Sequence, residues 1–237
     1  MVTIEVQETT FHDLTLEAEP RVTRGKGSLP EHLLNGWVSL GEPVAVSITS
    51  GDLFKDDDAL RQLVEAQSAK YRYHLIYLAC TFRAREGEPF VNAYLEVRLA
   101  HLNGDQEKQP IAISMRPFRL ENPVEISRTV NLGASVPLVP QVINAETGIE
   151  LTETATQQDI FLEALNEGQS NPVWGFYRTA RAEIRGMHRL FLITRTPTEV
   201  AGTGTVKLSA TVQRKHFGII PYIDPYPNSP QQSFHLT

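Results

Sequence analysis

The sequence predicts a mainly β protein: an antiparallel β-sandwich of Greek-key or jelly-roll type with two short peripheral helices. The clearest evidence is segment 205–213, in which apolar and polar residues alternate strictly, as in a strand with one face in water. In addition, short apolar stretches recur along the chain with Gly and Pro between them, which is typical of sandwiches.

The N-terminal third is predicted to contain strands, a loop and the first helix. Alternation indicates strands within 2–6 and 14–18, a loop over 21–34 and a strand pair within 36–48. The first helix is expected at 56–70, because three aspartates favour a helix N-terminus and Leu60, Leu63 and Val64 form an apolar stripe.

Two hairpins are predicted from adjacent amphipathic stretches. One joins 73–82 to 90–102 through a turn at Gly87, and the other joins 189–196 to 205–213 through a turn at 197–204. Segment 189–196 is apolar on both faces, so a further element must cover its second face. The candidates are the 156–166 helix, the C-terminal tail or another subunit.

Further strands are expected at 111–115, 124–132 and 136–143, and the second helix at 156–166. We expect one sandwich domain over 1–216 and a tail, rich in proline and aromatic residues, over 217–237. Because proline lacks a backbone N–H, this tail is expected to form neither a helix nor a central strand.

Composition favours a soluble globular protein of the cytoplasm. Cys80 is the single cysteine, so no intrachain disulfide forms, and no signal peptide or membrane-spanning apolar run is expected. The net charge of −6 argues against nucleic-acid binding.

The chain shows no phosphate loop and no nucleophile elbow, and its seven histidines are scattered. We therefore predict no catalytic residue, no metal ligand and no cofactor. A hydrolase that uses a pair of carboxylates, or a histidine with a carboxylate, from distant parts of the chain stays open as an alternative.

Charge is segregated around residue 170. Segment 144–170 carries six acidic residues and no basic one, whereas 171–196 carries five arginines against Glu183 alone. We interpret 178–185 as a strand with residues 181, 183 and 185 directed outward, in preference to a helix on which Arg178, Arg181, Arg185 and Arg189 would share one face. The arginines would face the acidic segment or an anionic ligand. Together with nearby and C-terminal aromatics, the candidate binding residues are Arg178, Arg181, Arg185, Arg189, Trp174, Tyr177, Tyr222 and Tyr226.

These observations favour a non-enzymatic interaction or assembly module that binds a protein partner or its own copies. A module that binds a small ligand, either a sugar or an anion, is the main alternative, with loops around Trp37, Trp174 and Tyr177 as its site. A membrane-active protein that inserts its amphipathic hairpins is a further alternative.

Overall fold

The computed structural model describes residues 9–19, 33–49, 57–104, 108–121, 160–215, 218–224 and 232–236. These residues form one α-helix and thirteen strands, which confirms the mainly β class. The elements are β1 (Phe11–Ala18), β2 (Leu33–Gly41), β3 (Val44–Ile48), α1 (Asp58–Gln67), β4 (Tyr71–Phe82), β5 (Phe90–His101), β6 (Ile111–Arg116), β7 (Arg119–Glu121), β8 (Ile160–Leu165), β9 (Val173–Tyr177), β10 (Gly186–Pro197), β11 (Gly202–Arg214), β12 (Gly218–Ile223) and β13 (Ser233–Leu236). The predicted strands within 2–6, 124–132 and 136–143 lie outside the described residues.

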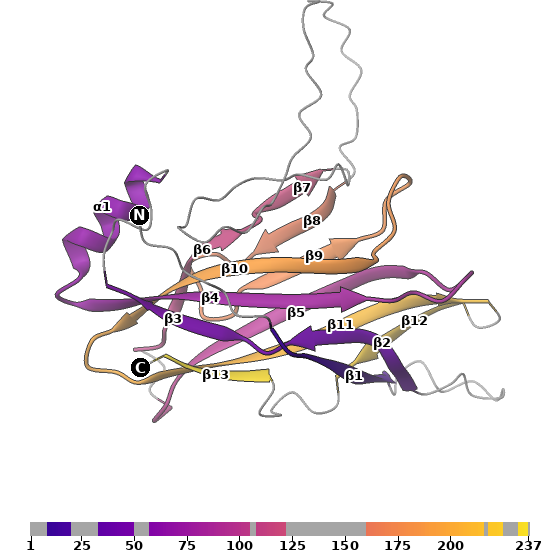
Figure 1. Ribbon diagram of the computed structural model, residues 1–237, viewed down its shortest axis with the longest axis horizontal. Coiled ribbons are helices and arrows are strands. Elements are labelled where there is room, and N and C mark those ends of the chain that lie inside the picture. Colours follow the sequence, from indigo (N-terminus) through magenta and orange to yellow (C-terminus); the bar gives the residue numbers. More distant parts are fainter. Residues whose placement is uncertain are drawn as a thin grey trace, which may run out of the picture.

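The strands form one antiparallel sheet and not the two separate sheets of a clear sandwich (Figure 1). Its order is β6-β10-β4-β2-β1-β12-β11-β5-β9-β8-β7, with β3 also on β4 and β13 also on β11. The end strands β6 and β7 are consecutive in the chain, so the sheet curves until its ends meet. Hydrogen bonds join Ala112 of β6 to Gly168 and Gln169 in the connection between β8 and β9.

The predicted hairpin strands exist, but the predicted hairpin pairings are wrong. β4 pairs with β10 along its whole length, from Phe82 opposite Gly186 to Tyr71 opposite Pro197. β5 pairs with β11 in the same way. Connections 83–89 and 198–201 therefore cross between two walls, which we call the β4–β10 wall and the β5–β11 wall. Alternation identifies the buried face of a strand but carries no information about its partner.

The β4–β10 wall is apolar on both faces, and α1 covers its outer face. Leu60 and Val64 of α1 pack there with Phe191 and Ile193 of β10 and with Ile48 of β3, the strand that pairs with β4. The first predicted helix is therefore confirmed, with the Asp57 carboxylate accepting a hydrogen bond from the Leu60 N–H at 3.0 Å. The sequence predicts that the 156–166 helix, the C-terminal tail or another subunit covers this face. The element that covers it is α1, which is none of these.

The predicted helix at 156–166 is wrong for Ile160–Leu165, which form β8 between β7 and β9. Its apolar residues also fit a strand, and burial between two neighbouring strands decides the outcome. Residues 156–159 lie outside the described residues.

The expectation that 217–237 forms no central strand is also wrong, because β12 lies between β1 and β11. Pro221 is tolerated there for a geometric reason. Its carbonyl faces β1 and accepts a hydrogen bond from the Glu19 N–H, one residue beyond the end of β1. Its missing N–H points the same way, so no β1 carbonyl within the strand loses a donor.

Candidate functional site

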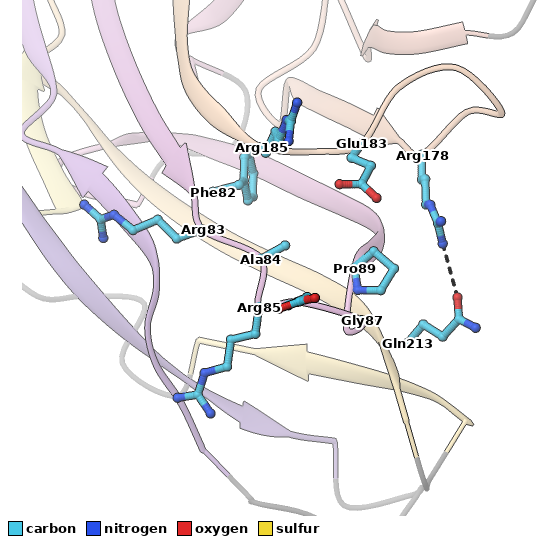
Figure 2. A pocket seen from close by; sticks show the side chains of 11 residues that line it. Phe82, Arg83, Ala84, Arg85, Gly87, Pro89, Arg178, Glu183, Arg185 and Gln213 are labelled. Atoms are coloured by element: carbon cyan, nitrogen blue, oxygen red, sulfur yellow. Dashed lines mark hydrogen bonds between the residues drawn. The ribbon is translucent and has the colours of Figure 1, made fainter.

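A hollow of about 720 Å³ lies where the β4–β5 turn faces the β9–β10 loop (Figure 2). Both segments are chain crossings at one end of the sheet. The hollow is bounded by Phe82, Arg83, Ala84, Arg85, Glu86, Gly87, Pro89, Arg178, Glu183, Arg185 and Gln213.

The β4–β5 turn is held by short-range backbone contacts. The Glu88 N–H donates to the Arg85 carbonyl at 3.0 Å, and Gly87 has a φ of +74°. Glycine therefore meets the conformational demand of this turn, which places Glu86 at its tip.

The β9–β10 loop is shaped by one hydroxyl and two buried side chains. The Thr179 hydroxyl accepts hydrogen bonds from the N–H groups of Arg181 and Ala182, at 3.3 and 3.0 Å. Ala182 and Ile184 are buried, so the side chains of residues 181, 183 and 185 are exposed. The predicted alternation of exposure is confirmed, but residues 178–185 form a loop and not a strand.

The arginines of the turn have partners outside the hollow. Arg83 donates to the Asp13 carboxylate at 2.8 Å, and Arg85 lies over the Trp37 ring at 4.9 Å from its centroid. Figure 2 shows both side chains directed away from the hollow. Hydrogen bonds from Ser39 and then from Arg83 lower the pKa of Asp13, so this network is fully charged at neutral pH.

The loop arginines differ. Arg178 donates to the neutral side-chain amide of Gln213 at 3.2 Å, and neither Arg181 nor Arg185 makes an ion pair with any described residue. Figure 2 shows Arg178 beside Gln213 and the Glu183 carboxylate directed toward the turn. Apart from Arg83 and Arg85, which point away, the lining carries two arginines, Arg178 and Arg185, and two glutamates, Glu86 and Glu183.

The structure brings two of the predicted site residues, Arg178 and Arg185, to the hollow. Arg181 is exposed on the same loop but does not line it. Arg189 lies in β10, half-buried, with its Nε buried and without a partner among the described residues. The expected contact between these arginines and the acidic segment is untested, because most of that segment lies outside the described ranges.

The predicted aromatic residues do not join the hollow. Trp174 is fully buried and its indole N–H donates to the Pro117 carbonyl at 3.1 Å, while Trp37 is also buried. Tyr222 is a core residue of β12. Tyr177 stands beside Tyr94 with ring centroids 6.0 Å apart, and burial raises the pKa of Tyr177 to about 12. Tyr226 lies outside the described residues.

Sequence reasoning missed Arg83, Arg85 and Glu86 of the turn, and Gln213 of β11. A signal was present, since residues 83–88 place four charges in a six-residue turn. Only the fold reveals that this turn faces the arginine loop.

Beneath the loop lies His188, packed against the rings of Phe82, Phe161 and Phe176. Burial lowers the pKa of His188 to about 4 despite a hydrogen bond to the backbone of Arg185. Cys80 stands opposite His188 in the β4–β10 register, and burial raises the pKa of its thiol. At neutral pH this pair therefore holds neither a thiolate nor an imidazolium, the species on which a cysteine nucleophile depends.

In the part of the chain that the structure describes, His, Cys, Asp and Glu form no cluster of three or more that could hold a metal ion. Nor does any helix in those ranges have the length and apolar character needed to cross a membrane. Fold and site thus define a mainly β protein with a charged hollow at one end of its sheet. No protein-family model matches the chain, and a search of curated proteins finds no match.

Proposed function

We propose that this protein is a binding module for a small ligand that carries a carboxylate or phosphate group. The observation that carries the proposal is the position of Arg178 and Arg185 on the lining of one hollow, where neither guanidinium group makes an ion pair with any residue that the structure describes. Guanidinium forks suit the oxygens of carboxylate and phosphate.

The size and lining of the hollow support the same proposal. A volume of about 720 Å³ lies within the range of roughly 300–1,000 Å³ that is typical of small-molecule sites. Phe82, Ala84 and Pro89 add apolar surface, while Gln213 offers an uncharged donor and acceptor. A small ligand would therefore meet both apolar contacts and oriented polar groups.

Isothermal titration calorimetry with succinate, citrate and inorganic phosphate tests this proposal. We expect at least one of these anions to bind, and the double variant Arg178→Gln with Arg185→Gln to weaken that binding by at least about tenfold, equivalent to about 1.4 kcal/mol. The matched control is Arg98→Gln with Arg119→Gln, two arginines outside the hollow that each pair with a glutamate. The proposal fails if no anion binds or if both double variants bind alike.

A second candidate function is association with a protein partner or with further copies of this chain. Two apolar side chains at the hollow end favour it, because Met187 is 50% exposed and Ile219 is 61% exposed. Sedimentation velocity tests self-association: an oligomer that Met187→Lys with Ile219→Lys dissociates supports it, and a wild-type monomer at every concentration opposes self-association. A cytoplasmic location belongs to the same proposal and is supported by the absence of any intrachain disulfide.

A further inference from the structure

The β4–β10 wall carries polar side chains on its inner face, at the end that lies away from the hollow. Alternate residues of both strands belong to the main core and to the outer cluster under α1. The inward set at this end is Arg72, His74, Thr194 and Thr196. In the register His74 stands opposite Thr194, and Arg72 stands opposite Thr196. Because opposite residues have Cβ atoms about 5 Å apart, the two pairs form one polar cluster inside the curved sheet.

The two threonine hydroxyls of this cluster are buried without a partner. Thr194 and Thr196 are both 0% exposed, and neither Oγ1 atom has a hydrogen-bond partner among the described residues. A buried hydroxyl without a partner costs free energy, and native proteins satisfy nearly all such groups with protein atoms, water or an ion. Valine would fill the same space without this cost, so packing alone does not call for threonine at these positions.

Arg72 adds a positive charge to the cluster. Its side chain is partly buried, its Nε atom is buried without a partner, and its guanidinium group donates to the Val200 carbonyl. No described carboxylate makes an ion pair with Arg72. The buried acid Asp224 accepts a hydrogen bond from Gln232. The unpartnered atoms therefore offer one N–H and two O–H donors beside a positive charge, which disfavours a cation and favours an anion.

We propose that Arg72, Thr194 and Thr196 bind a single chloride ion. A monoatomic anion accepts hydrogen bonds from several directions, and its single charge matches the single guanidinium group. Larger anions are excluded, because both threonines are closed to solvent. This site is independent of the proposed function. A strand rises about 3.3 Å per residue, so Arg72 near the start of β4 lies about 33 Å along it from Phe82 at the hollow.

Urea denaturation in sodium chloride and in sodium gluconate, at equal ionic strength, tests the proposal. Gluconate is too large for the site, so we expect the midpoint in chloride to rise above that in gluconate and to saturate. Thr194→Val with Thr196→Val removes both hydroxyls and should abolish this difference. The matched control Thr205→Val with Thr211→Val, at partly exposed positions of β11, should keep it. Equal wild-type midpoints in the two salts, or an unchanged difference in the Thr194 and Thr196 variant, would overturn the proposal.

The arginines of the hollow provide a control for chloride bound elsewhere. Arg178→Gln with Arg185→Gln leaves the buried cluster intact, so this variant should keep the full chloride response. A response that this variant loses would place the ion in the hollow and contradict the buried site.

Bromide, which replaces chloride and scatters X-rays anomalously, locates the ion directly. In a crystal of the whole chain soaked in sodium bromide, we expect an anomalous peak between the Arg72 Nε atom and the hydroxyls of Thr194 and Thr196. Water at that position without anomalous signal would show that water alone satisfies the hydroxyls, and the proposal would fail.

Discussion

The arginines at the hollow end of the sheet fall into two groups that differ in their partners. Arg214 is 5% exposed, pairs with Glu88 at 2.8 Å and lies over the rings of Trp37 and Tyr222. Arg178, Arg181 and Arg185 are exposed, and none pairs with a carboxylate among the described residues. The buried, paired arginine contributes to the fold, and we propose that the exposed group binds the ligand.

The largest expected effect is on the buried group. Arg214→Met removes the ion-pair partner of Glu88, whose side chain is only 20% exposed, and leaves that carboxylate with a hydrogen bond of 3.4 Å from the Lys215 N–H. We expect the free energy of unfolding to fall by about 4 kcal/mol, as measured by urea denaturation. The matched variant Arg181→Met should change it by less than about 0.5 kcal/mol. Equal losses in the two variants would remove the distinction between the groups.

The next effect concerns His188, which lies under the β9–β10 loop. The unfolded state takes up a proton near the ordinary pKa of 6.5, while in the folded state the pKa of His188 is about 4. Protonation therefore favours unfolding as the pH falls from 6.5 to 4, by at most about 3 kcal/mol.

The variant His188→Phe lacks this titration, so its stability should fall less than that of the wild type over the same pH range. Urea denaturation at pH 7, 5.5 and 4.5 measures the difference. Parallel losses of stability in both proteins would show that His188 is solvated and that the loop does not cover it.

A smaller effect is expected at the partly exposed pair of Arg83 and Asp13, whose side chains are 50% and 57% exposed. Asp13→Asn should lower the free energy of unfolding by less than about 1 kcal/mol at pH 7, because water screens the pair. The lowered pKa of Asp13 means that this stabilisation is present at neutral pH and is lost as the pH falls through that pKa. A loss as large as that in Arg214→Met would place both pairs in the structural core.

Local features of the fold are readable from the sequence, whereas its pairings are not. The acidic residues and apolar stripe of α1 lie within one short segment. The strict alternation of β11 matches the alternation of buried and more exposed side chains along this strand. The partner of β4 is β10, more than 100 residues away, and no local pattern encodes that choice. Pro221 is a second example. Whether a central strand accepts a proline there depends on where the neighbouring strand β1 ends, and the local sequence does not show this.

The candidate site divides in the same way. Charge density alone identifies the arginine loop, and the burial of Ala182 and Ile184 follows from their alternation with charged residues. The turn with Arg85, Glu86 and Gly87 faces this loop only because connection 83–89 crosses from the β4–β10 wall to the β5–β11 wall, which the sequence does not reveal. Trp174 was a candidate because exposed tryptophans stack on sugars, but its ring is fully buried.

The most direct test of the ligand-binding hollow is a ¹H–¹⁵N NMR titration of the whole chain with citrate. The account predicts chemical-shift changes concentrated at the amides of residues 83–88 and 178–185, at the side-chain amide of Gln213 and at the Nε–H groups of Arg178 and Arg185. Amides at the other end of both walls, in the 198–201 connection, should stay unchanged. Saturable changes centred elsewhere, for example around Tyr94 and Tyr177, or no saturable change at any citrate concentration, would contradict it.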